Sequence, residues 1–195
     1  MKTQLSRRES GFTLVELLVV IAIIAVLAGA GFAAGNAAIQ KAKKTTALAT
    51  CVALEQAVNN FSTEYGCMPS ALTIDTALDT KLNIIDFLNV LLGIESSQTP
   101  LNTRAIKFLS AKEGKANKNG IIYNSAGTTV TGLYDPWGGT YKVMLDCDYD
   151  EKLAPKPKAG GTTVTLNGRK AAAWSDGADG ALTGKGTTLD DVKTW

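Results

Sequence analysis

The stretch Gly11-Phe12-Thr13-Leu14-Val15-Glu16 opens an apolar run that continues to about Ala34. The residues before it are polar and basic, with Lys2, Arg7 and Arg8. A secretory signal carries its small residues after the apolar core, whereas Gly11 precedes the core here. Cleavage after Gly11 would therefore remove a leader and leave the apolar helix on the protein as its membrane anchor.

The apolar run is long enough to cross a membrane. About 23 mostly apolar residues can span a hydrocarbon core of about 30 Å as a helix. Charge alone does not orient this span, because Lys41, Lys43 and Lys44 follow it much as the basic residues of the leader precede it. The position of Gly11 between leader and core is what favours a cytoplasmic N-terminus.

Glu16 is the acidic residue of this span and needs an explanation. A carboxylate within an apolar span costs about 2.5–3.5 kcal/mol on insertion scales, so Glu16 is a candidate functional residue. The alternative is a carboxylate close enough to the helix start to reach the interface and favour the positive helix N-terminus.

Gly-Phe-Thr-Leu-Val-Glu followed by an apolar helix resembles the class III signal of type IV pilins and type II secretion pseudopilins, over residues 7–35. The resemblance implies that a prepilin peptidase cleaves after Gly11 and methylates the new amine of Phe12. It also implies that Glu16 of one subunit neutralises the Phe12 amine of the next during filament assembly. An uncleaved signal anchor that contains a glutamate is the alternative.

Residues 29–36 are rich in glycine, and each glycine costs about 1 kcal/mol relative to alanine within a helix. The family resemblance implies a locally melted segment here in the assembled filament. A bent but continuous helix is equally compatible with the sequence.

Beyond Ala37 the helix becomes amphipathic. Apolar residues recur at spacings of four and three, at Ala47, Cys51, Leu54, Val58, Phe61 and Tyr65. This stripe predicts packing against the chain's own C-terminal domain, since it is too short for a convincing coiled-coil seam. Gly66 and Pro69 end the helix.

Roughly 130 residues remain after the leader and the long helix, enough for one domain with its own core. Residues 84–92 predict a short helix stopped by Gly93, and residues 134–141 form a turn before an alternating strand at 141–145. Residues 170–175 predict another strand.

The predicted fold is α+β, with a long N-terminal helix packed on a small antiparallel sheet domain. The expected divisions are a leader (1–11), a transmembrane and polymerisation helix (12–35), an amphipathic helix (36–65) and a globular head (66–195).

Composition argues against catalysis and nucleic-acid binding. The chain has no histidine and no Gly-rich phosphate loop, so the commonest general base and every His-dependent triad are missing. The net charge of +2 equals the charge of the leader, with three basic residues and Glu9. A near-neutral mature chain is not typical of a polyanion-binding protein.

The chain has three cysteines, Cys51, Cys67 and Cys147. Cys51 and Cys67 would lie about 24 Å apart along a helix and could not pair. Cys67 and Cys147 are the best disulfide candidates in an exported domain, and three free thiols are the alternative.

Asp-Pro-Trp-Gly at 135–138 and Trp-Ser-Asp-Gly-Ala-Asp-Gly at 174–180, with aspartates before the final Trp195, resemble the major pseudopilin (G subunit) of type II secretion. The resemblance implies a C-terminal calcium site. Its expected ligands are Asp179 and Asp190 or Asp191, with Asp176 as a further candidate. Calcium accepts six to eight oxygens in loose geometry. The alternative is that these acids are solvated turn residues or caps.

Residues 146–151 also resemble the start of an EF-hand loop. They lack its glycine at the sixth position, and Pro157 stands where the twelfth-position acid belongs. Acids at a strand end beside a hairpin explain the pattern equally well.

The sequence thus predicts a structural subunit, a pseudopilin that polymerises into the periplasmic filament of a type II secretion system. We expect a single pass through the bacterial inner membrane, with a cytoplasmic N-terminus and a periplasmic head. The expected partners are further copies in a helical filament, the prepilin peptidase, other pseudopilins and the inner-membrane secretion platform. The alternative is a type IV pilus subunit for adhesion, motility or DNA uptake, although pilins more often end in a cysteine-bounded loop and no cysteine follows Cys147.

Overall fold

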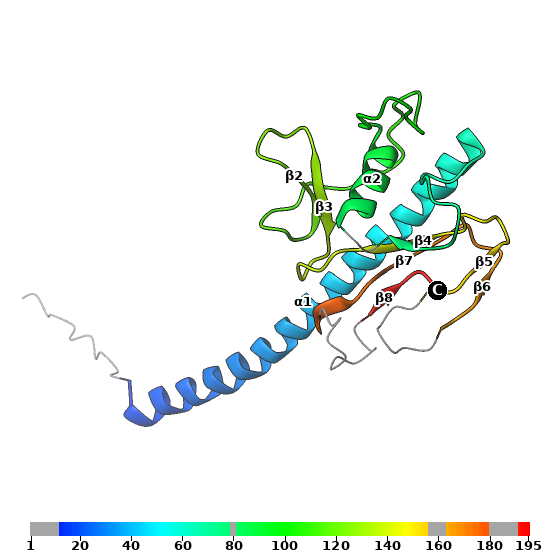
Figure 1. Ribbon diagram of the computed structural model, residues 1–195. Coiled ribbons are helices and arrows are strands. Elements are labelled where there is room, and N and C mark those ends of the chain that lie inside the picture. The colour runs from blue at the N-terminus through cyan, green and yellow to red at the C-terminus, as the bar shows by residue number, and fades with distance from the viewer. Residues whose placement is uncertain (1–11, 79–80, 156–162, 180–190) are drawn as a thin grey trace, which may run out of the picture. The chain divides into compact units, whose positions relative to one another are not determined.

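The computed structural model describes residues 12–78, 81–155, 163–179 and 191–195 (Figure 1). The chain divides into two compact units, Met1–Lys41 and Ala42–Trp195. The long helix α1 runs from Leu14 to Tyr65 and contributes to both.

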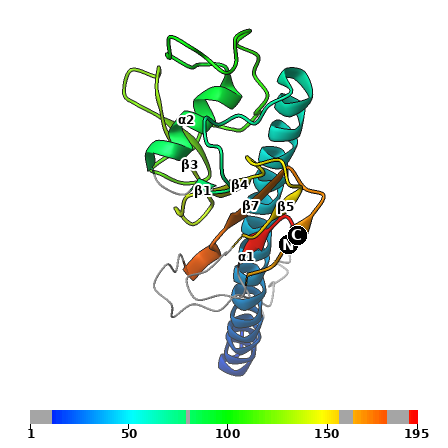
Figure 2. The same cartoon turned by 45° about the vertical axis from the view of Figure 1, so that its right-hand side comes forward.

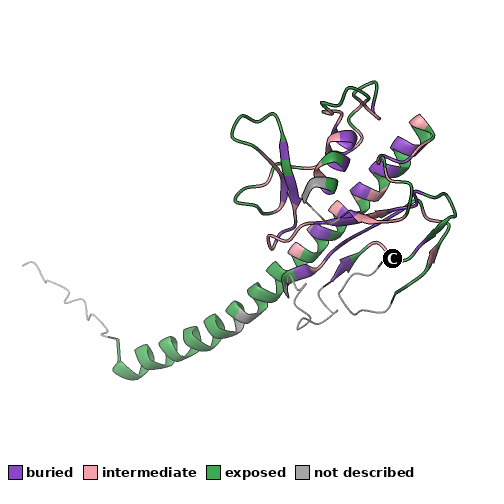
Figure 3. Ribbon diagram, viewed as in Figure 1, coloured by how far each residue is buried: buried purple, intermediate pink, exposed green. Residues whose placement is uncertain are grey.

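In the first unit, α1 exposes its apolar side chains (Figure 3), with Phe12 just before it 76% exposed and Phe32 81% exposed. The helix is long and apolar enough to cross a membrane, by length and composition. It is continuous through residues 29–36 in the single chain. A melted segment in the assembled filament therefore stays a prediction.

In the second unit, the predicted stripe of α1 lies in the core, with Tyr65 at its end partly buried. Ala47, Cys51, Leu54, Val58 and Phe61 are fully buried in the core of this unit. The helix ends where the sequence predicts, because Gly66 takes a positive φ of 69° and donates its N–H to the Ser62 carbonyl at 2.9 Å. The stripe packs on the chain's own head, as predicted.

A four-stranded antiparallel sheet lies across this part of α1 (Figures 1 and 2). Its order is β1 (Ala77–Leu78), β4 (Lys142–Leu145), β7 (Ala171–Ser175) and β8 (Val192–Lys193). Val143 and Leu145 point their side chains into the core shared with α1. Because neighbouring residues of a strand face opposite sides, Lys142 lies on the other face.

Helix α2 (Lys81–Leu92) packs against β3 (Val130–Tyr134), which pairs with β2 (Gly120–Tyr123). Gly93 ends α2 with a φ of +70°. Both the helix and its stop agree with the prediction. Leu88 and Leu91 of α2 join the same core as α1. Each such buried leucine contributes about 1.5–3 kcal/mol.

Strands β4 and β7 confirm the two predicted strands, and with α1 they confirm the α+β fold. The sequence did not predict β1, the β2–β3 hairpin, or the short hairpin of β5 (Lys152–Leu153) and β6 (Leu166–Asn167). Strands β1, β5 and β6 have two residues each, which is too short for an alternating pattern to be detected in the sequence.

The Asp-Pro-Trp-Gly turn is organised by the carboxylate of Asp135, which is 1% exposed. Its Oδ1 accepts the backbone N–H groups of Trp137, Gly138 and Gly139 at 2.9, 2.8 and 2.9 Å. Its Oδ2 accepts the hydroxyl of Ser175 at 2.6 Å. The motif therefore serves to join the turn to β7.

Candidate assembly and metal sites

The N-terminal turn of α1 holds Glu16 in a reciprocal cap. The Glu16 Oε2 accepts the backbone N–H of Thr13 at 2.8 Å and its hydroxyl at 2.7 Å. The Glu16 N–H donates to Thr13 Oγ1 at 3.3 Å. This is a capping box, in which an N-cap threonine and an acidic residue three positions later satisfy each other's backbone donors.

The cap gives Glu16 a local role in the single chain, in agreement with the helix N-terminus alternative. It does not exclude pairing with another subunit, because both Thr13 bonds end on one carboxylate oxygen. Gly11 lies outside the described residues. Cleavage after Gly11, methylation of Phe12 and the Glu16–Phe12 pairing stay predictions.

Of the predicted calcium ligands, the structure describes the side chains of Asp176 and Asp191. Asp190 lies outside the described residues, as does the side chain of Asp179, whose backbone ends the 3₁₀ turn η1 (Gly177–Asp179). Asp191 is buried. Asp176 accepts a hydrogen bond from Lys142 Nζ at 2.7 Å, with the two side chains 15% and 9% exposed.

The Lys142 pair bears directly on the fit of calcium at this end of the chain. A calcium ligand set needs carboxylate oxygens that face the ion, and one oxygen of Asp176 faces an ammonium instead. The other oxygen of Asp176, Oδ1, is buried without a hydrogen-bond partner among the described residues. For Asp176, Asp179, Asp190 and Asp191 the calcium assignment stays a prediction.

A second acidic cluster lies at the far end of β4. Carboxylate oxygens of Asp75, Asp146, Asp148 and Asp150 all lie within 4.8 Å of one another. Asp146 is 2% exposed and accepts the backbone N–H groups of Asp150 and Glu151 at 3.1 and 3.2 Å. This cluster can bind a hard divalent cation through its carboxylate oxygens.

Burial and the repulsion between neighbouring carboxylates both raise pKa values in this cluster. The pKa of Asp75 is raised, first by burial and then by the charges of Asp148 and Asp146. The pKa of Asp146 is raised by burial and by Asp148 and Asp150. Both shifts favour the protonated form, so the ionised cluster is strained without a counter-charge.

Sequence reasoning found the 146–151 part of the cluster and missed Asp75. The pairing of β1 with β4, in which Ala77 lies opposite Met144, brings Asp75 next to the other carboxylates of the cluster. The Oδ1 of Asp75 accepts the N–H of Cys147 at 2.8 Å. The sequence around Asp75 contains no local pattern that predicts this long-range contact.

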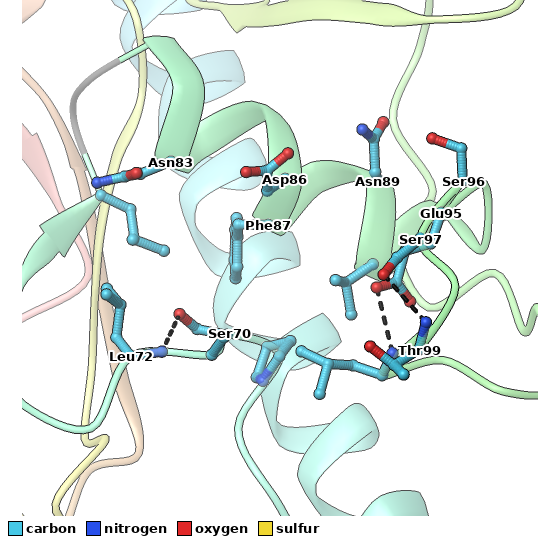
Figure 4. A pocket seen from close by; sticks show the side chains of 15 residues that line it. Ser70, Leu72, Asn83, Asp86, Phe87, Asn89, Glu95, Ser96, Ser97 and Thr99 are labelled. Atoms are coloured by element: carbon cyan, nitrogen blue, oxygen red, sulfur yellow. Dashed lines mark hydrogen bonds between the residues drawn. The ribbon is translucent and has the colours of Figure 1, made fainter.

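The head also contains a cavity of about 630 Å³ between α2 and the loops on either side of it (Figure 4). Phe87 and Leu72 give it apolar walls, and Asp86, Ser97 and Thr99 add polar groups. Among the described residues that line it, none is basic.

All three cysteines are free thiols, and the Cys67–Cys147 disulfide is not formed. Burial raises the pKa of the Cys51 thiol to about 12 and that of Cys147 to about 11. Thiols with such pKa values hold few thiolates at neutral pH, so neither is a good nucleophile.

Residues 6–32 match the family model described as the prokaryotic N-terminal methylation motif. No curated protein and no solved structure matches the chain. The matched residues contain the Gly11–Phe12 junction, Glu16 and the first turns of α1, and they do not distinguish the G subunit from other pilin-like proteins. Proteins with this motif are structural and typically not enzymes. The chain therefore carries a type IV pilin-like methylation motif at the head of a long apolar helix, which implies a membrane-anchored, prepilin-like filament subunit.

Proposed function

We propose that the chain is a pseudopilin of a type II secretion system, cleaved after Gly11 and methylated on Phe12. The observation that carries the proposal is Glu16, a lone acid four residues after Phe12 on an otherwise apolar and exposed helix. An acid at that depth needs a positive partner. The amine created by cleavage, on a neighbouring subunit, would provide one.

The head adds support for a secretion filament over a pilus. The Asp-Pro-Trp-Gly motif, whose sequence resembles that of the G subunit, is held in the fold by the hydrogen bonds of Asp135. No cysteine follows Cys147, and the described head contains no disulfide, unlike the cysteine-bounded loop typical of pilins. The proposed topology places the N-terminus in the cytoplasm and residues 42–195 in the periplasm.

The test has two readouts. The first measures processing of the leader, and the second shows whether the protein belongs to a secretion system or to a pilus. Intact mass and N-terminal sequencing of the protein from the membrane fraction should give a chain that starts with N-methylated Phe12. A Gly11→Val variant should keep its leader, whereas Glu9→Ala, within the leader, should be processed normally.

The second readout uses a deletion of the gene in its own host. Loss of protein secretion with surface pili retained is the expected result. Loss of pili with secretion intact would instead identify a pilus subunit, and an unprocessed chain in the wild type would contradict both assignments.

A further inference from the structure

Residues 112–118, just before β2, form a compact basic loop. Their sequence, Lys-Glu-Gly-Lys-Ala-Asn-Lys, contains three exposed lysines and one glutamate. Backbone hydrogen bonds hold the loop closed, because the Gly114 N–H donates to the Ile121 carbonyl at 2.8 Å and the Ile121 N–H donates to the Lys112 carbonyl at 2.9 Å. The loop is therefore preformed, and a partner that binds it would not have to order its backbone.

Two lysines of the basic loop face each other across a tight turn. Lys115 and Lys118 each donate the backbone N–H to the other's carbonyl at 3.1 Å. Ala116 and Asn117 between them have φ values of 51° and 55°, as in a type I′ turn. Like charges directly opposite each other destabilise such a pair. Among the described residues, no carboxylate forms an ion pair with either lysine, so a negative partner would relieve this repulsion.

The basic loop lies against the turn that precedes β4. The Asn119 N–H donates to the Asp135 carbonyl at 2.8 Å, and Gly138 lies against Lys118. Strand β4 then leads directly into residues 146–151, which we call the acidic loop. The basic and acidic loops therefore lie at opposite ends of β4, and Figure 1 shows them on opposite sides of the head, the basic loop beside β2 and the acidic loop beside β5.

The acidic loop has the complementary charge. Its carboxylates, together with that of the neighbouring Asp75, belong to Asp146, Asp148, Asp150 and Glu151. Lys152 offsets one of them, with its Nζ 3.6 Å from Asp150 Oδ2. Five carboxylates against one ammonium leave this surface negative even when a divalent cation is bound to the cluster.

We propose that the basic loop of one subunit docks on the acidic loop of the next subunit in the filament. The proposal rests on the proposed function, because it requires copies of the chain to assemble. One subunit cannot join its own two loops across the length of β4, whereas a second copy presents the matching charge. A contact between two different surfaces repeats from copy to copy and builds an open assembly rather than a closed dimer.

The contact is expected to set the orientation of neighbouring heads more than the strength of association. Exposed ion pairs each contribute little, while complementary charges favour one arrangement over others. The heads are also held close together once the apolar halves of α1 assemble, which raises the effective concentration of each loop at its partner.

The test uses the full processed chain in membranes of its host, with filament yield measured by cross-linking and shearing. Lys115→Glu/Lys118→Glu should lower the yield by about tenfold, because like charges then face each other across the contact. Reversal of the acidic loop by Asp148→Lys/Asp150→Lys/Glu151→Lys should do the same. Lys107→Glu changes an exposed lysine outside the basic loop and should assemble as the wild type does.

Co-expression of the two reversed proteins is the decisive measurement. Each has two loops of like charge, so neither should assemble alone, whereas together they should alternate and recover at least about half of the wild-type yield. A mixture that stays at low yield would overturn the contact, and is the result expected if the basic loop binds an anionic lipid surface instead. A wild-type chain that is not processed or does not assemble would contradict the proposed function, not this contact.

Thermal unfolding of the full chain in detergent separates assembly from folding. Lys115→Gln/Lys118→Gln removes the repulsion within the hairpin, so its Tm should not fall, while its filament yield should fall several-fold. A lower Tm together with a lower yield would show that the lysines serve the fold, and would overturn the proposal. If the reversed acidic loop does not fold, Lys118→Glu and Glu151→Lys replace the two reversed proteins. Their combination in one chain should then assemble better than either change alone, and an additive loss would contradict the contact.

Discussion

The hydroxyl and the backbone N–H of Thr13 both donate to the same carboxylate oxygen of Glu16, at 2.7 and 2.8 Å. The residue expected to neutralise a neighbouring subunit therefore also caps its own helix. The two roles have different chemical requirements. Capping needs an acceptor oxygen, which glutamine also has, whereas neutralisation needs a negative charge.

Substitution of Glu16 separates these roles. Glu16→Gln should keep the helix cap and normal cleavage but abolish filament assembly, because the charge is lost. Glu16→Ala should lose both its part of the cap and assembly. Assembly is measured by cross-linking of subunits in membranes and by electron microscopy of sheared filaments.

The matched control for Glu16 is Glu64→Gln. Glu64 lies on the same helix, α1, and forms an exposed ion pair with Arg104. The Glu64→Gln protein should assemble normally, since exposed pairs contribute little. Normal filaments from Glu16→Gln, with loss only in Glu16→Ala, would show that capping rather than charge is what assembly needs.

Asp135 is expected to be a major determinant of the stability of the head. Asp135→Ala would leave three backbone N–H groups and the Ser175 hydroxyl without their acceptor in a buried site. We expect a loss of about 3–5 kcal/mol in the free energy of unfolding. Asp135→Asn should cost less, because its amide oxygen can still accept. Chemical denaturation measures both.

Asp86→Ala, on the exposed side of α2, removes the same charge without removing a buried acceptor and should change the free energy of unfolding by less than about 0.5 kcal/mol. If Asp135→Ala proves equally mild, the Asp-Pro-Trp-Gly turn does not anchor β7.

The main elements of the fold were predictable because they are local. The stripe on α1, the stop at Gly66 and the alternation before Leu145 each depend on a few neighbouring residues. The pairs that define the candidate sites are not local. Lys142 and Asp176 are 34 positions apart, and Asp75 and Cys147 are 72 positions apart. Such contacts depend on which strands pair and in which register, and a single sequence does not specify either.

The thiols provide a test of burial in the core between α1 and the sheet. Burial raises the pKa of Cys51 from 9.0 to about 12, with smaller contributions from the charges of Asp135 and Glu55. A raised pKa in the folded state means that this group's contribution to stability is complete below pH 9 and is lost as the pH rises toward 12. We therefore expect alkaline destabilisation over that range.

Alkylation of the thiols at pH 8, measured by mass spectrometry, is a second test of the burial of Cys51. Cys67 is half-buried and should react first, whereas Cys51 should react only at the rate of unfolding. Unfolding in urea should make all three thiols equally reactive. Rapid labelling of Cys51 in the folded protein would contradict its place in the core.

The acidic cluster predicts an unusual response to charge removal. Burial, and then the repulsion from Asp148, raise the pKa of Asp75 and Asp146. In chelator at neutral pH, Asp148→Asn should therefore be more stable than the wild type, because it relieves this repulsion. These raised pKa values give stability that is complete below the ordinary carboxyl pKa of 3.8 and is lost as the pH rises. The advantage of the variant should therefore shrink as the pH falls from 7 toward 4.

Calcium should make the wild type more stable than Asp148→Asn. A divalent cation held by the four carboxylates offsets their repulsion, so the wild type should gain thermal stability from about 5 mM calcium while Asp148→Asn gains less. Asp86→Asn, an exposed acid outside the cluster, serves as the control and should respond to calcium as the wild type does. An Asp148→Asn protein that is less stable than the wild type in chelator would show that hydrogen bonds, such as the one from the Asp150 N–H to Asp148 Oδ1 at 3.2 Å, outweigh the repulsion between the carboxylates.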